Sequence, residues 1–118
     1  MNNCIVIIDD NKRQLDGYTK DVMNPFSIEA KMKAFGFNTQ TVKGNDLDAI
    51  DEAITKAKSV TDSAVCIVLD TIKGQGVKFF EELLDNHSVK FNTEEVNRAT
   101  DEAKASLKKE IEEEEQHV

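Results

Sequence analysis

The sequence predicts an α/β domain in layers, with a short, mainly parallel sheet flanked by helices. Two continuous apolar runs rich in β-branched residues, residues 4–8 and 64–70, are typical of parallel strands buried on both faces. In a third run, residues 37–42, the side chains of Phe37, Thr39 and Thr41 lie opposite those of Asn38, Gln40 and Val42. Such alternation is typical of an edge strand that helices cover less. Helical patterns alternate with these runs, which favours right-handed crossovers and layered packing.

Three helices are expected between and after the strands. Ser27 can cap a helix that continues to Phe35, and Gly36 provides its left-handed exit. Asn45 with Asp48 resembles a capping box, and apolar residues at helical spacing follow it. A long terminal helix is expected to bury one apolar stripe, formed by Val96, Ala99, Ala103, Leu107 and Ile111.

Composition and charge limit the classes of function. With 118 residues there is room for one hydrophobic core, and 15 basic against 23 acidic residues give a net charge of −8, which argues against nucleic acid as a partner. No apolar stretch approaches the length that spans a bilayer, and the start lacks the pattern of a secretory signal. Cys4 and Cys66 lie in apolar runs without a CxxC motif, which favours reduced thiols. We therefore expect a cytoplasmic protein without a membrane partner.

Polar residues stand where the first strand ends, because Asp9, Asp10 and Asn11 follow directly on the apolar run. Irregular segments follow both the first and the third strand, at the carboxyl ends where open α/β sheets bind ligands. Two kinds of site have this form. A phosphorelay receiver uses paired acids to hold Mg²⁺, whereas a thiamine-diphosphate enzyme uses an Asn to hold Mg²⁺ on the cofactor diphosphate.

The receiver interpretation would make Asp70 the phosphoacceptor, but it conflicts with the rest of the chain. A receiver enters a helix almost directly after its acid pair, whereas a long loop with Gly17 and Pro25 comes next here. Asp70 also lies too far along the chain from Asp10, and the segment after Asp70 does not supply the further strands that a receiver needs. The loops favour the second interpretation, in which an Asn side chain and a nearby backbone carbonyl give Mg²⁺ two oxygens.

Four segments in order, IVIIDDNKRQLDGYT, NPFSIEAKMKAFGFN, IVLDTIKGQGVKFFE and NHSVKF, resemble the thiamine-diphosphate-binding domain of transketolase. The resemblance covers residues 3–91 and is greatest to the amino-terminal subunit of the split, two-gene form. It implies that residues 1–91 form part of a thiamine-diphosphate-binding fold and that residues 92–118 form a carboxy-terminal helix with an acidic tail. It further implies transfer of a two-carbon ketol unit between sugar phosphates, in pentose phosphate metabolism, with thiamine diphosphate and Mg²⁺ or another divalent cation.

The resemblance assigns roles to five positions. Asn11 matches an Asn whose side chain binds Mg²⁺, and Arg13 matches the position whose backbone carbonyl is the next ligand. Leu15 and Ile72 match apolar residues beside the cofactor. His87 aligns with a His that contacts the diphosphate and faces the substrate channel, so it is the expected catalytic residue. Read without the family, Asn11 could instead serve an Asx turn, and His87 could be a plain loop residue.

Several family elements are missing from the sequence. A GDG strand end, whose Asp is the leading Mg²⁺ ligand, would lie upstream of the first strand, and the glutamate that activates the cofactor comes from a second subunit. We therefore expect weak or no turnover from the isolated chain, and a dimeric assembly with a second transketolase subunit and the upstream half of the same subunit. The alternative is a non-catalytic remnant or interaction module, because an apolar strand without its neighbours favours aggregation or partner binding.

Overall fold

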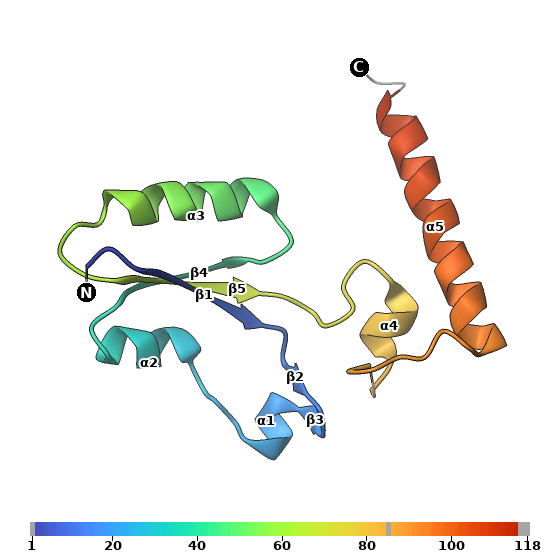
Figure 1. The fold of residues 1–118 in the computed structure, drawn as a ribbon, viewed down its shortest axis with the longest axis horizontal. Helices are drawn as coiled ribbons and strands as arrows, with labels where there is room; N and C mark the ends of the chain where they lie inside the picture. The colour runs from blue at the N-terminus through green and yellow to red at the C-terminus, as the bar shows by residue number, and fades with distance from the viewer. Residues whose placement is uncertain (1, 85, 116–118) are drawn as a thin grey trace. The chain divides into compact units, whose positions relative to one another are not determined.

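A computed structural model describes residues 2–84 and 86–115 (Figure 1). The chain divides into two compact units, residues 1–73 and residues 74–118. The predicted domain division between residues 91 and 92 stays a prediction. In the described part of the chain, no helix has the length and apolar character needed to cross a membrane.

The first unit is built on three parallel strands in the order β1-β5-β4. Their bounds are Ile5–Asp10 for β1, Asn38–Lys43 for β4 and Val65–Asp70 for β5. Asp10 and Lys43, the last residues of β1 and β4, both lie opposite Asp70 in the register, so all three strands end at one edge of the sheet. The predicted α/β class with a short parallel sheet is confirmed.

Helices cover both faces of this sheet, with α2 (Ile28–Ala34) on one side and α3 (Leu47–Ser59) on the other (Figure 1). The central strand β5 carries the core, and Ile67 of β5 packs with Ala53 and Ala57 of α3. Burial of these apolar side chains is the main favourable contribution to folding. The prediction that β5 is buried on both faces is confirmed, as is the edge position of β4.

β1 differs from the prediction. Its apolar run was expected to be buried on both faces, yet Ile5 and Ile7 are 39% and 53% exposed. The alternating residues Val6 and Ile8 are half-buried. Within the described residues β1 pairs with β5 alone, so its outer edge and one of its faces are left uncovered. The prediction of a doubly covered strand is therefore wrong for β1 in this chain.

Local hydrogen bonds explain where the two helices begin. Ser27 Oγ accepts a hydrogen bond from the backbone N–H of Ala30 at 3.0 Å, as the sequence predicted. α3 is capped by Asp46, whose carboxylate accepts from the backbone N–H of Ala49 at 3.0 Å. The prediction of Asn45 as the cap is therefore wrong by one residue, because the negative carboxylate of Asp46 reaches the positive end of the helix dipole.

The long segment between Asn11 and Ser27 contains short regular elements that the sequence did not predict. These are β2 (Arg13–Gln14), β3 (Gly17–Tyr18) and α1 (Thr19–Val22). β2 and β3 form a two-residue antiparallel ladder, in which Gly17 adopts a φ of 130°. Because such a φ disfavours any side chain, a glycine suits this hairpin.

The second unit contains α4 (Lys78–Glu82) and the long helix α5 (Glu94–Glu115). Val96 of α5 is buried as predicted, and Ala99 and Ala103 are half-buried. The predicted burial of Leu107 and Ile111 is wrong, since these side chains are 58% and 48% exposed. Length explains the difference, because α4 has 5 residues and cannot cover a helix of 22.

Candidate functional site

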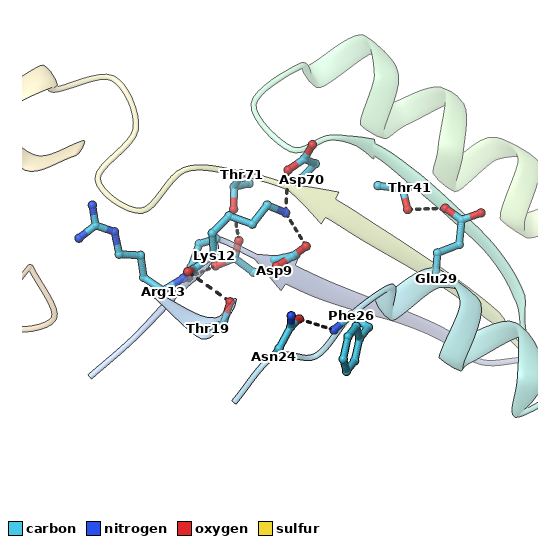
Figure 2. A network of polar contacts seen from close by, with 12 residues as sticks. Asp9, Lys12, Arg13, Thr19, Asn24, Phe26, Glu29, Thr41, Asp70 and Thr71 are labelled. Atoms are coloured by element: carbon cyan, nitrogen blue, oxygen red, sulfur yellow. Dashed lines mark hydrogen bonds and ion pairs between the residues drawn. The ribbon is translucent and has the colours of Figure 1, made fainter. Parts of the chain in front are cut away.

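The candidate site lies at the carboxyl edge of the sheet in the first unit, where β1 and β5 end side by side (Figure 2). The pairing continues one residue past the end of β5, because the backbone N–H of Thr71 donates to the carbonyl of Asp10, the last residue of β1, at 3.3 Å. The two irregular segments, which begin at Asn11 and Thr71, therefore start from the same place, as the sequence predicted.

Asn11 forms an Asx turn at the end of β1. Its Oδ1 accepts a hydrogen bond from the backbone N–H of Arg13 at 3.1 Å, and its Nδ2 donates to Oδ2 of Asp9 at 2.9 Å. The turn interpretation of Asn11 is thus correct as far as local structure goes. It is compatible with metal binding, because an amide oxygen has two lone pairs and the Arg13 N–H uses one.

Lys12 is a positively charged residue that pairs with carboxylates at this edge, and the sequence analysis missed it. Its Nζ pairs with a carboxylate oxygen of Asp10 and lies 2.8 Å from Oδ1 of Asp70. Partial burial disfavours the ammonium, but the hydrogen bonds to the two carboxylates outweigh it and raise the pKa of Lys12 above 10.5. Two neighbouring parallel strands that both end in Asp bring like charges together, which a nearby cation stabilises, and Lys12 follows two residues after Asp10.

Arg13 uses its side chain within the β2–β3 hairpin. Nη2 donates to the hydroxyl of Tyr18 at 3.1 Å, and the guanidinium carbon lies 4.3 Å from the centroid of the Tyr18 ring. The hydrogen bond and the cation–π contact hold the hairpin that follows Asn11. The Arg13 side chain is thus engaged with Tyr18, and the role of its backbone carbonyl as a metal ligand stays a prediction.

Comparison with known proteins places the chain in a family. The sequence model described as transketolase, thiamine diphosphate binding domain, matches residues 1–114. The chain belongs to this transketolase family. Because the chain matches this family, the paired acids no longer favour a phosphorelay receiver domain, the alternative that they had suggested.

Several similar proteins are transketolase subunits. The chain is 40% identical over 111 residues to the 6-deoxy-6-sulfo-D-fructose transketolase subunit SqwG of Clostridium sp. (strain MSTE9), covering 93% of this chain and 38% of that protein. It is 31% identical over 104 residues to a subunit of the apulose-4-phosphate transketolase of Actinobacillus succinogenes, covering 88% and 37%. A transketolase of Nostoc sp. is 38% identical over 78 residues, covering 64% and 12%. The chain thus spans less than two fifths of the length of these relatives.

Four of the five predicted transketolase site residues lie in the first unit. Asn11 and Arg13 are joined by the Asx hydrogen bond. Leu15, in the hairpin turn, is 64% exposed, and Ile72, in the loop after β5, is 53% exposed. His87 belongs to the second unit, where it is exposed in a bend after α4. The functional roles of all five stay predictions.

The oxygens at the site fit a metal that is held mainly by a diphosphate. In residues 2–84 and 86–115, no three His, Cys, Asp or Glu side chains gather to hold a metal ion. Asn11 Oδ1 and the backbone carbonyl of Arg13 offer two neutral oxygens, and Mg²⁺ often takes one or two protein ligands with phosphate and water completing the rest. The donor set of this chain therefore suits Mg²⁺ whose remaining ligands come from a diphosphate and water.

Proposed function

We propose that this chain is the portion of a transketolase that holds thiamine diphosphate through Mg²⁺, in an enzyme that transfers a two-carbon ketol unit between sugar phosphates. The observation that carries the proposal is the meeting of the Asn11 turn and the Thr71 loop at one sheet edge, in a chain of the thiamine diphosphate binding family. In open α/β sheets this edge is where ligands bind. We also propose that the enzyme acts in pentose phosphate metabolism and that it is cytoplasmic.

Each predicted site residue has a role in this proposal. Asn11 Oδ1 and the Arg13 carbonyl would hold Mg²⁺, and the exposed side chains of Leu15 and Ile72 would lose water against the cofactor. His87 would contact the diphosphate and face the substrate, where it can hold or move a proton. Bound thiamine diphosphate supplies the carbon–carbon chemistry, while these residues bind and orient it.

The isolated chain is proposed to be weakly active or inactive, because it spans less than two fifths of the length of the transketolase subunits that it matches. We propose that it works in a dimeric assembly with a second transketolase subunit and with the upstream half of the same subunit. Two observations support this proposal: two of the named relatives are transketolase subunits more than twice as long as this chain, and β1 leaves Ile5 and Ile7 exposed. The same uncovered strand also favours the alternative, a non-catalytic interaction module of this fold.

Thermal unfolding of the 118-residue chain tests the cofactor proposal. A ligand that binds only the folded state raises the midpoint, and at 100 times its dissociation constant it adds about 2.7 kcal/mol to the free energy of unfolding. At that saturation we expect Mg²⁺ with thiamine diphosphate to raise the midpoint by about 10–20 °C, since 1 kcal/mol shifts the midpoint of a small domain by about 4–8 °C. Mg²⁺ alone should have little effect.

Two Asn variants make the test specific. Asn11→Ala should abolish the rise in the midpoint, whereas Asn24→Ala should keep it. Asn24 is a matched control, because its Oδ1 accepts from the backbone N–H of Phe26 at 2.8 Å in the same kind of turn. If the natural chain gives no rise at millimolar cofactor, cofactor binding by this portion is wrong and the interaction module becomes the better description.

A further inference from the structure

A chain of three hydrogen bonds connects the loop after β5 to the turn after β1. Thr71 Oγ1 donates to Oδ1 of Asp9, as Figure 2 shows. The other carboxylate oxygen of Asp9, Oδ2, accepts from Nδ2 of Asn11 at 2.9 Å, and Asn11 Oδ1 accepts from the Arg13 N–H at 3.1 Å. Asp9 thus stands between the two loops, and each of its carboxylate oxygens has one donor.

The chemistry of these groups permits one orientation of the Asn11 amide. An ionised carboxylate only accepts hydrogen bonds, so the NH₂ group of the amide must face Asp9. A backbone N–H only donates, so the carbonyl oxygen must face Arg13. Exchanging the two ends of the amide would break both hydrogen bonds and place an oxygen against the carboxylate of Asp9.

Packing holds the hydroxyl of Thr71 in place. Gly44, after the end of β4, donates its backbone N–H to the carbonyl of Asp70 at 2.9 Å. A Cβ on Gly44 would lie 2.2 Å from Cγ2 of Thr71 and 2.9 Å from Cβ of Leu69, so the Thr71 methyl group fills the space that the missing side chain leaves. With its methyl group seated there and its own N–H on Asp10, Thr71 presents its hydroxyl to Asp9.

We propose that Asp9, held by Thr71, is a positioning residue that fixes the Asn11 amide with its oxygen available in the turn. The consequence of this positioning is a better oxygen ligand for Mg²⁺ at Asn11, and that consequence rests on the proposed function. A carboxylate that accepts from the amide NH₂ fixes the orientation and draws electron density toward Oδ1. Removing such outer partners of a metal ligand typically lowers metal affinity by 10–100-fold, and this exposed network belongs at the lower end, about tenfold.

Two substitutions of Thr71 separate the hydroxyl from the shape of the side chain. Thr71→Val keeps the branched shape and removes the donor to Asp9, whereas Thr71→Ser keeps the donor and removes the methyl group. Asp9→Ala removes the acceptor of the Asn11 amide directly. In all three variants Asn11 and Arg13, the groups proposed to touch the metal, remain unchanged.

The first readout is the ¹⁵N–¹H spectrum of the Asn11 side-chain amide in the chain without cofactor. In the natural chain one of the two Nδ2 protons is bonded to a carboxylate, so the two protons should give well-separated signals. We expect the separation to collapse in Asp9→Ala, to fall in Thr71→Val and to persist in Thr71→Ser. An unchanged separation in both Asp9→Ala and Thr71→Val would overturn the proposal.

The second readout is the dissociation constant of thiamine diphosphate at saturating Mg²⁺, measured by calorimetry. Thr71→Val should raise it about tenfold and Thr71→Ser by much less. If Thr71→Val alters the amide signals but not the affinity, Asp9 has a merely structural role and the positioning proposal is wrong. If the natural chain does not bind the cofactor, the proposed function fails for this chain, and the amide signals alone then decide whether Asp9 positions Asn11.

Discussion

Asp10 and Asp70 lie opposite one another in the register of β1 and β5 and share the ammonium group of Lys12. The shared cation balances two like charges at the sheet edge where both strands end. Lys12 reaches them from a left-handed backbone conformation, with a φ of 65°. The charge balance beside Asn11 therefore depends on a strained residue.

Substitution of Lys12 should separate its charge from its backbone strain. Lys12→Ala loses both ion pairs and keeps the strain, so we expect it to lower the free energy of unfolding by about 1 kcal/mol, the upper end for exposed pairs. Lys12→Gly loses the same pairs but relieves the strain, and it should be more stable than Lys12→Ala by about 1 kcal/mol. Urea denaturation measures both.

Lys56→Ala is the control for these variants, because it removes an exposed pair with Glu52 within the regular helix α3. Lys56→Gly should be less stable than Lys56→Ala, since glycine weakens a helix interior. The same order at position 12, with glycine the less stable, would contradict the proposed strain.

Gly44 should tolerate no side chain while Thr71 keeps its methyl group. Gly44→Ala would place a Cβ 2.2 Å from Thr71 Cγ2, and overpacking of this kind costs about 1–3 kcal/mol. Serine lacks that methyl group, so Thr71→Ser should recover part of the loss in the double variant. A double-mutant cycle by urea denaturation measures the coupling, and additive effects of the two substitutions would contradict this packing of Thr71 against Gly44.

Acid should weaken the contact between α2 and β4. The hydrogen bond from Lys33, and then the one from Thr41, lower the pKa of the Glu29 carboxyl below 4.5. Because the pKa is lower in the folded state, the contribution of Glu29 to stability is present above about pH 4.5 and is lost as the pH falls through the folded-state pKa.

Carbon-detected NMR titration can measure the pKa of Glu29 directly. Lys33→Ala should raise it most and Thr41→Val by less, since the Lys33 hydrogen bond is the larger cause. Glu52, whose pKa is lowered by its hydrogen bond and ion pair with Lys56, serves as an internal control that neither variant should move. A Glu29 pKa at or above 4.5 in the natural chain would show that the contact does not form in solution.

The uncovered face of β1 should promote self-association of the isolated chain. Ile7→Gln replaces a 53% exposed apolar side chain on β1, whose outer edge is unpaired within the described residues, and should shift the chain toward monomer. Leu47→Gln is the control, because Leu47 is 81% exposed at the start of helix α3 and belongs to no strand. Light scattering across a range of concentrations should separate the two, and equal effects would contradict a special role for β1.

The fold could be predicted where the sequence pattern and the local surroundings agree. The apolar pattern of β5 predicts a strand covered on both faces. The strand is buried in this way, because α2, α3 and two strands of the same chain surround it. β1 has the same apolar pattern but lies exposed at Ile5 and Ile7. The apolar pattern of β1 is typical of a strand that other residues cover, in accord with the proposed assembly with an upstream half. An apolar pattern indicates that a strand needs covering, but it does not indicate which part of a protein covers it.

The candidate site could be predicted in part for a similar reason. The Asx turn at Asn11 follows from the residue type and its position after a strand, both of which are local properties. The contacts of Lys12 and Thr71 depend on the register of β1 against β5, residues that lie far apart in the sequence. The left-handed conformation of Lys12 has no signal in its residue type. Long-range register is therefore what sequence reasoning missed at this site.

The central claim is that the carboxyl edge of this sheet holds the diphosphate of thiamine diphosphate through Mg²⁺. The most direct test is a map of backbone amide shifts in ¹⁵N–¹H spectra as thiamine diphosphate is added to the chain in saturating Mg²⁺. We predict that the shifts concentrate in residues 11–17 and 71–76 and at His87, and that Asn11→Ala suppresses them. Shifts that are absent, or that concentrate along α5 while the edge of the sheet stays unchanged, would contradict the claim.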